Sequence, residues 1–168
     1  MAEAFPNSNF YGYDTSKEGI EAAREESRQK GISNAFFETK DASSIDESSK
    51  FEFVTAFDTI HDQPKPTKVL QTIHKSLKSN GIFLMQDTAV SSNLQDNISN
   101  PVAPILYTFS AMHSMATSIA CDGEWPGTLW GKQKAEQKLR EAGFFEKSIE
   151  IFEIPGDILN YYYFARKA

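Results

Sequence analysis

Short apolar runs of strand type alternate along this chain with segments of helical type, and this alternation most constrains its fold. The runs of strand type in the first half are Asn9–Tyr13, Ala35–Thr39, Phe51–Phe57 and Ile82–Met85. Strands that are separated by helices pair in parallel and are buried on both faces, which suits the nearly continuous apolar character of Phe51–Phe57. The sequence therefore predicts an α/β domain with a mostly parallel sheet.

Local signals place the first two helices of this alternation. Thr15 and Ser16 offer hydroxyl groups to begin a helix, and Gly31 offers a left-handed residue to end it. A second helix is expected to begin at Pro64 and Pro66, to run through Leu77, and to end at Asn80-Gly81.

The end of the chain follows a different pattern. Two strand-like runs, Ser148–Ile154 and Leu159–Arg166, are joined by a short connection that contains Pro155-Gly156-Asp157. A connection this short joins neighbouring antiparallel strands. We therefore expect an antiparallel terminal strand on an otherwise parallel sheet.

Residues 93–127 interrupt the alternation. Asn93–Ile119 has mostly helical character with breaks at two prolines, and the glycine-, proline- and tryptophan-containing segment Cys121–Gly127 reads as a loop before a helix at Leu129–Glu141. Since 168 residues suffice for one domain with a core and not for two, we expect a single domain over residues 1–168, with 93–127 as a helical insertion.

Composition excludes several classes of function. The chain has 17 basic and 23 acidic residues, a net charge of -6, and no basic stripe that would neutralise a nucleic-acid backbone. One cysteine, Cys121, gives neither a disulfide framework nor a cysteine-rich metal site. There is no signal-peptide pattern, and polar residues interrupt the most apolar window, Ile105–Ala120. We expect a cytoplasmic protein with a small-molecule partner, no metal and no membrane span.

Acidic residues follow the first two strands. Asp14 is placed to accept hydrogen bonds from two ribose hydroxyls, and Asp41 is placed to accept one from an adenine amine, because ligands of open α/β sheets bind at the carboxyl ends of the strands. The alternatives are that Asp14 only caps a helix and that Asp41 only holds its own turn.

The three histidines are the candidates for proton transfer near neutral pH. His61 follows the Phe51–Phe57 strand, and the alternative for it is a surface or supporting histidine. His113 lies among Phe109, Met112 and Met115. In such an apolar setting a core histidine is the default interpretation, and a base in a pocket is the alternative. His74 lies within a predicted helix and is interpreted as structural.

Taken in order, these segments resemble the class I S-adenosylmethionine-dependent methyltransferases that act on small molecules and carry a helical insertion after the fifth strand of the family fold. The resemblance covers nearly the whole chain. It rests on segments that are weak singly and specific as an ordered set: Phe5-Pro6, Phe10–Asp14, Asp41-Ala42, Phe51–Asp58, His61-Asp62, Val69-Leu70, Leu77–Ile82 and Leu139–Phe144.

The resemblance implies a Rossmann-like sheet, S-adenosyl-L-methionine as cofactor, and a role for particular residues. Asp14 and Thr15 would bind the ribose, Asp41 and Ala42 would line the adenine, and Phe57 and Asp58 would border the methionine part. His61 and Asp62 would lie at the rim where substrate enters. Residues 93–127 would cover the substrate, with Trp125 and Trp130 as possible walls.

One departure from the family pattern bears on activity. The family's first strand and glycine-rich loop precede the acidic residue, whereas Asp14 has thirteen residues before it and none of the nine glycines forms a Gly-x-Gly pair. The missing strand would be central, between the strands that contain Tyr13 and Phe57, so we expect open strand edges there. We also expect a domain truncated at its N-terminus, whose binding of the cofactor is weak.

The leading hypothesis is methyl transfer to oxygen or nitrogen of a small acceptor, with His61 or His113 as general base. A non-catalytic binding or regulatory protein, working as a homo- or hetero-oligomer, is the alternative. An NAD-linked oxidoreductase fragment shares the Asp14 signal and lacks an antiparallel terminal hairpin, which makes it the third choice.

Overall fold

The computed structural model describes residues 1–115 and 129–168. Their contacts divide the chain into two compact units, Met1–Ile45 and Asp46–Ala168, which are described separately. Cys121 and Trp125 lie outside the described residues, so the predictions made for them stay predictions. The same holds for the single domain and for the bounds of the 93–127 insertion.

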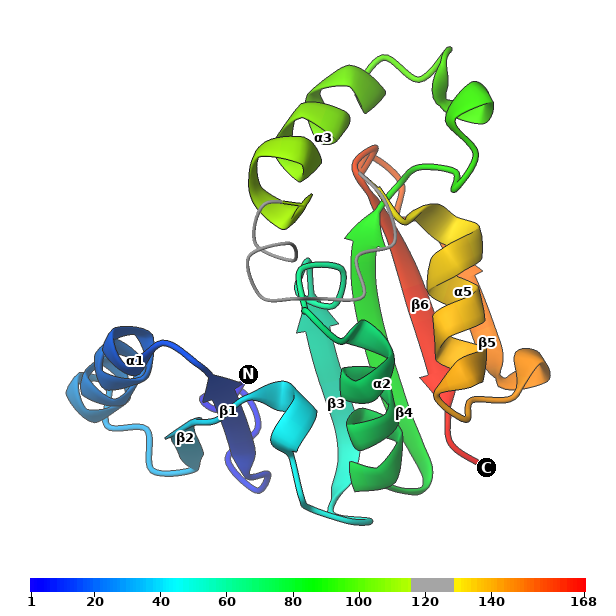
Figure 1. The fold of residues 1–168 in the computed structure, drawn as a ribbon. Coiled ribbons are helices and arrows are strands. Elements are labelled where there is room, and N and C mark those ends of the chain that lie inside the picture. Colours follow the sequence, from blue (N-terminus) through cyan, green and yellow to red (C-terminus); the bar gives the residue numbers. More distant parts are fainter. Residues whose placement is uncertain (116–128) are drawn as a thin grey trace. The chain divides into compact units, whose positions relative to one another are not determined.

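The first unit is a small βαβ element. β1 (Phe10–Asp14) pairs in parallel with β2 (Ala35–Thr39), and α1 (Lys17–Gln29) connects them (Figure 1). The Ser16 hydroxyl caps α1 by accepting a hydrogen bond from the Gly19 amide at 3.0 Å. Gly31 adopts φ 64° after the helix, as the sequence predicted.

The second unit contains a four-stranded sheet in the order β3-β4-β6-β5. β3 and β4 are parallel, whereas β6 is antiparallel to both of its neighbours, so the predicted antiparallel terminal hairpin is confirmed. The mixed sheet with helices between its strands confirms the predicted Rossmann-like class. The strands of this sheet are β3 (Phe51–Phe57), β4 (Leu77–Thr88), β5 (Ile149–Phe152) and β6 (Asn160–Arg166).

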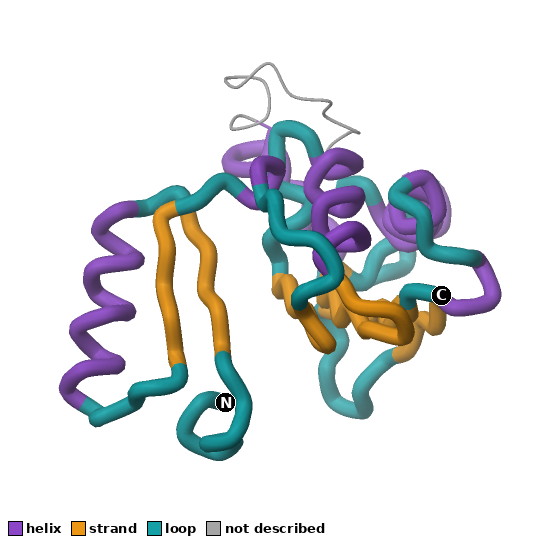
Figure 2. The backbone as a smooth tube through the Cα atoms, turned by 90° about the horizontal axis from the view of Figure 1, so that it is seen from below, coloured by secondary structure: helices purple, strands orange, loops and turns teal. Residues whose placement is uncertain are grey.

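Two helices, α2 (Pro66–Ser76) and α5 (Gly131–Glu141), cover one face of this sheet (Figures 1 and 2). The cross-strand pairs Phe83↔Ala165 and Met85↔Tyr163 lie on that face, and all four side chains are fully buried. The opposite face carries Phe53, Phe57 and Phe152, which are 42–50% exposed. The core of the unit therefore lies between the sheet and these two helices.

The second helix ends four residues earlier than predicted. Leu77–Asn80 is extended chain at the beginning of β4, because the segment that enters β3 pairs with it: Phe51 is the register partner of Leu77, and the Lys50 amide donates to the Ser76 carbonyl at 2.7 Å. Asn80 takes φ 62° and donates its amide to the Lys167 carbonyl. Tertiary pairing overrides the helical pattern there.

The strand edges follow the expectation drawn from the family pattern. Among residues 1–115 and 129–168, β1 pairs only with β2, and β3 pairs only with β4 on one side. Each of these two strands therefore has one edge without a hydrogen-bonded neighbour in the part of the chain that is described.

A polar clamp joins the chain after β4 to the start of α5. The Ser92 hydroxyl donates to the Trp130 carbonyl at 2.5 Å and accepts from the Lys134 amide at 2.9 Å, so it caps α5 from a distant part of the sequence. Gly131 has φ 68°, and a Cβ there would lie 2.4 Å from the Ser92 nitrogen. The segment between β4 and α5 is thus fixed at both of its ends.

The described part of that segment, which ends at Met115, contains η2 (Leu94–Asn97), α3 (Ala103–Phe109) and the π-helical turn η3 (Ser110–Ser114). Asn97 is buried and holds the Ser91 amide and carbonyl through its side chain. Phe109 and Met112 are 64% and 76% exposed, so these apolar neighbours of His113 do not form a core around it.

Candidate active site

The carboxyl ends of β3 and β4 lie side by side because the strands are parallel and in register, with Phe57 opposite Gln86. Asp58 follows β3 with φ 47°, and its amide donates to the Gln86 carbonyl at 3.2 Å. The Gln86 side chain in turn donates to the Asp58 carboxylate at 2.9 Å. The chain therefore turns sharply at Asp58 and brings the next residues over the end of β4.

His61 lies on this turn and meets Asp87 of β4. Its Nδ1 is 3.0 Å from Asp87 Oδ1, which also accepts the Thr88 amide at 2.7 Å. The Asp87 side chain is 1% exposed and the His61 side chain 16%. A carboxylate at Nδ1 holds a proton on that nitrogen and leaves Nε2 to exchange the other, which is the arrangement of a histidine base with an orienting acid.

The charges around His61 set its pKa. Burial of the ring lowers the pKa, but the hydrogen bond and charge of Asp87, together with the charges of Asp62 and Asp58, outweigh burial and raise the pKa of His61 to about 9. Partial desolvation and the neighbouring Asp87 charge also raise the pKa of Asp58. Since histidine titrates near 6.5 in the absence of such partners, His61 is mainly protonated at neutral pH.

Asp62 stands between two histidines. Its Oδ1 lies 3.4 Å from His61 Nε2, and its Oδ2 lies 3.6 Å from His113 Nε2. His113 comes from the π-helical turn η3, and its side chain is 73% exposed. The default interpretation of His113 as a core histidine is therefore wrong: the turn directs the ring to the surface beside Asp62.

The predicted residues of the first unit lie on exposed turns. Asp14 is exposed and accepts a hydrogen bond from the Ser16 amide at 2.8 Å, next to Thr15, which is also exposed. Asp41 accepts a hydrogen bond from the Ser43 amide at 2.7 Å and is the N-cap of the short helix η1 (Ala42–Ser44), whose first residue is Ala42. Asp41 thus holds its own turn and caps η1, which was the alternative to cofactor binding, whereas Asp14 holds the turn before α1, whose cap is Ser16.

The turn contacts of Asp14 and Asp41 leave carboxylate oxygen available to bind the adenosine part of a cofactor. Asp14 and Asp41 follow adjacent parallel strands whose ends are in register, with Asp14 opposite Thr39. Asp14 is exposed, and its hydrogen bond with the Ser16 amide uses one of its two carboxylate oxygens. The chain thus fits the ribose end of a nucleotide cofactor, while its sequence has no Gly-x-Gly turn for close approach of a backbone.

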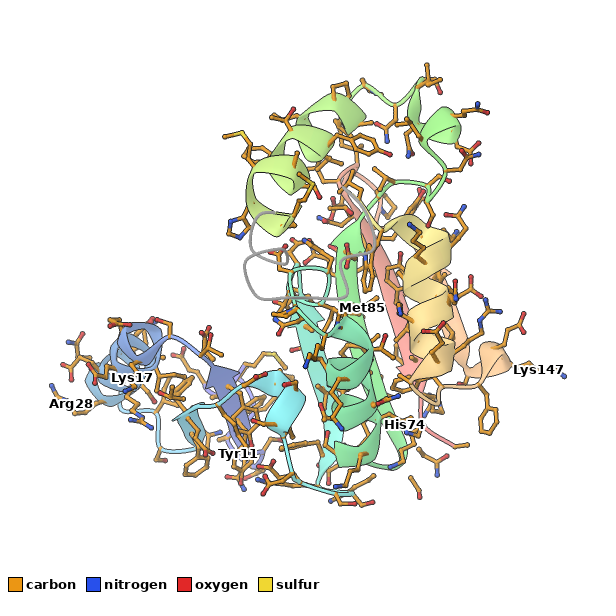
Figure 3. The ribbon with its side chains drawn as sticks, in the orientation of Figure 1. Tyr11, Lys17, Arg28, His74, Met85 and Lys147 are labelled. Carbon is orange, nitrogen blue, oxygen red and sulfur yellow. The ribbon has the colours of Figure 1, made fainter. Side chains whose placement is uncertain are left out.

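Three other predicted residues have clear positions. Phe57 ends β3 on the open face of the sheet and is 50% exposed. Trp130 is 2% exposed, so its interpretation as a pocket wall is wrong, because the Ser92 clamp fixes its backbone and the side chain packs in the core. His74 lies on α2 (Figure 3), and its ring packs edge-to-face on Phe144 at 4.8 Å, as expected for a structural histidine.

The sequence-based prediction missed Asp87 as the partner of His61. Its signal was present, because an acid near the end of the Ile82–Met85 run lies at the same edge of a parallel sheet as the residues after Phe57. No pattern along the chain indicated that two residues 26 positions apart would form a buried contact.

The described residues lack both a metal-binding cluster and a membrane-spanning helix. Residues 1–115 and 129–168 contain no cluster of three or more histidine, cysteine or acidic side chains arranged to hold a metal ion. No described helix is long and apolar enough to cross a membrane.

Comparison with known proteins identifies the family. Residues 1–143 match the model of a methyltransferase domain. A search of curated proteins gave no match.

Solved structures share the fold. An O-methyltransferase family protein from Burkholderia thailandensis superposes with a TM-score of 0.72 at 16% identity, over 99% of this chain and 47% of that one. The structure of PigF with SAH gives 0.67 at 17% identity, over 99% and 51%. A SAM-dependent methyltransferase from Aquifex aeolicus gives 0.65 at 15% identity, over 95% and 69%.

At these identities the structural likeness establishes the fold alone. The chain spans about half the length of several of the solved proteins it matches. The family model covers residues 1–143, which is well over half of the chain. The chain belongs to the methyltransferase domain family.

Proposed function

We propose that this domain serves S-adenosylmethionine-dependent methyl transfer to oxygen or nitrogen of a small-molecule acceptor, with His61 as general base. The observation that carries the proposal is the hydrogen bond from His61 to the buried Asp87 at the carboxyl ends of β3 and β4. This is the edge at which open α/β sheets bind their ligands.

The chemistry needs few groups from the protein. The cofactor supplies a methyl group on a positively charged sulfur. Neutral His61 would accept the acceptor's proton at Nε2, while Asp87 holds the ring by Nδ1 and stabilises the imidazolium that forms. With a pKa of about 9, His61 suits acceptors whose O–H or N–H is itself weakly acidic. His113 is the second candidate base, since it is exposed.

The remaining site assignments belong to the same proposal. Asp14, Thr15, Asp41 and Ala42 would contact the adenosine part of the cofactor, and the Phe57-Asp58 turn would border its methionine part. The family match and the exposed carboxylates after β1 and β2 support these roles.

Transfer of labelled methyl from S-adenosylmethionine, at millimolar cofactor, to a panel of phenols, alcohols and amines tests the proposal. His61→Gln should lower turnover at least 100-fold, the usual contribution of a general base, without changing cofactor affinity. His74→Gln, far from the proposed chemistry, is the matched control. Equal turnover by wild type and His61→Gln would remove His61 from the mechanism.

A non-catalytic binding role is the second candidate. The absence of a Gly-x-Gly pair from the sequence and the open edges of β1 and β3 in the described residues favour it. Such a protein would form a complex with a second polypeptide and would transfer no methyl group. The methyltransferase match and the antiparallel β6 stand against the NAD-linked alternative.

A further inference from the structure

Asp62 has a position that the proposed methyl transfer does not use. Its Oδ1 is buried without a hydrogen-bond partner in the described structure and faces His61 Nε2 at 3.4 Å. Its Oδ2 faces the exposed His113. A buried carboxylate oxygen without a hydrogen-bond donor lowers the free energy of unfolding. The position of this oxygen beside a proton-bearing nitrogen therefore calls for a functional explanation.

We propose that Asp62 and His113 form a proton exit path that carries the proton from His61 Nε2 to solvent. His61 Nε2–H would give its proton to Asp62 Oδ1. After rotation of the carboxyl group, the acid would pass the proton to His113 Nε2, and the protonated His113 would release a proton to water. The charge on each group is restored at the end, and no other reactant is needed. Asp62 and His113 are positioning residues here, because neither needs to contact the acceptor.

The geometry fits transfer by small side-chain movements. Separations of 3.4 and 3.6 Å are longer than ordinary hydrogen bonds, so each step needs a brief approach of the two groups. His113 is 73% exposed and Asp62 26%, and side chains with that freedom rotate in picoseconds to nanoseconds. His113 also belongs to a π-helical turn, a feature found often at functional sites.

The charges around His61 hold its proton, which therefore needs a route to solvent. Asp58 and Asp62 face it from its own turn, Asp87 faces it from β4, and the buried Tyr163 of β6 lies near Asp87. Together the carboxylates retain the proton on His61. The His61 side chain is 16% exposed and that of His113 is 73% exposed, so the path would connect a largely buried ring with solvent.

Proton exchange at His61, measured by NMR on the isotope-labelled 168-residue chain, tests the path without cofactor or acceptor. In the wild type, exchange at Nε2 should be fast and insensitive to buffer concentration. In His113→Gln and in Asp62→Asn it should fall about tenfold and rise linearly with added imidazole, which substitutes for the missing carrier. Met112→Gln, one residue away on the same exposed turn, is the matched control and should behave as the wild type.

The outcomes separate this inference from the proposed function, on which it depends only for its role in turnover. Buffer-dependent exchange in His113→Gln supports the path even if the chain transfers no methyl group. Exchange that is equally fast in wild type, His113→Gln and Asp62→Asn overturns the path and leaves His61 as a base. Unchanged histidine chemical shifts outside the site would show that the variants remain folded.

Discussion

Acidic residues end strands in both units of the molecule, but their surroundings differ. Asp14 and Asp41 of the first unit are exposed and accept hydrogen bonds from amides two residues ahead of them. Asp87 of the second unit is fully buried beneath α2 and α5 and accepts from His61. The same residue type at the same end of a strand therefore holds a local turn in one unit and is the electrostatic partner of a histidine in the other. Cover by helices makes the difference, because only a desolvated carboxylate shifts a neighbour's pKa strongly.

Two glycines with left-handed backbone, one in each unit, extend this comparison, and here we expect the largest effect on stability. Gly131 and Gly31 have similar backbone angles, φ 68° and 64°, but a Cβ at Gly131 would lie 2.4 Å from the Ser92 nitrogen, whereas no atom lies within 4 Å at Gly31. Gly131→Ala should cost about 4 kcal/mol, the sum of left-handed strain and a clash with backbone.

Gly31→Ala is the matched control and should cost about 1–2 kcal/mol, from strain alone. Urea unfolding followed by tryptophan fluorescence measures the second unit, since both tryptophans belong to it. Amide hydrogen exchange in β1 and β2 measures the first. Equal losses for the two variants would show that the Ser92 clamp contributes little.

The dependence of stability on pH is the second expected effect. The folded-state pKa of His61 is about 9 and the unfolded value about 6.5, so the protonated ring stabilises the folded chain. This contribution, about 3 kcal/mol, should be complete below pH 6.5 and should disappear as the pH rises through 9. Urea midpoints of the second unit between pH 6 and 10 measure it, and a flat profile would contradict the predicted pKa.

Asp87→Asn should remove most of that dependence. Without the carboxylate, the pKa of His61 should fall to its ordinary value or below. Burial of the ring lowers this pKa, and the Asp87 charge that opposes the effect of burial would be gone. We expect the second unit to lose about 2–3 kcal/mol at pH 7, near the lower end for breaking a buried pair. Histidine NMR titration measures the pKa directly, and an unchanged value near 9 would assign the shift to Asp62 and Asp58 instead.

Asp14→Asn completes the comparison and should have the smallest effect. Asp14 is exposed, and asparagine can also accept the Ser16 amide, so stability of the first unit should change by no more than about 0.5 kcal/mol. Hydrogen exchange of the β1 and β2 amides measures this change. A loss as large as that of Asp87→Asn would mean that cover by helices does not distinguish the two acids.

Much of the fold could be predicted from sequence because its signals are local. β2 and β3 begin and end where the apolar runs do, Ser16 caps α1, and Pro155-Gly156-Asp157 joins an antiparallel hairpin. The prediction failed at Leu77–Asn80, where the apolar pattern continues a helix but pairing with Phe51 extends the chain.

The site was predictable only in part. His61 could be singled out by its place after a strand, but Asp87 could not be matched to it along the sequence. The default interpretation of His113 as a core histidine was wrong because it followed from its apolar neighbours Phe109 and Met112, and yet all three side chains are exposed. Local hydrophobicity does not report which face of a short helix finds a partner.

The order of elements, the strand ends at which acids gather, and the resemblance to methyltransferases could all be read from the amino-acid sequence, because they depend on residues close together along the chain. The burial of Asp87 against His61, the position of Asp62 between two histidines and the exposure of Asp14 became visible only in the folded chain. Burial depends on what packs over a residue from elsewhere in the chain, and burial fixes the charge and the proton affinity of these groups.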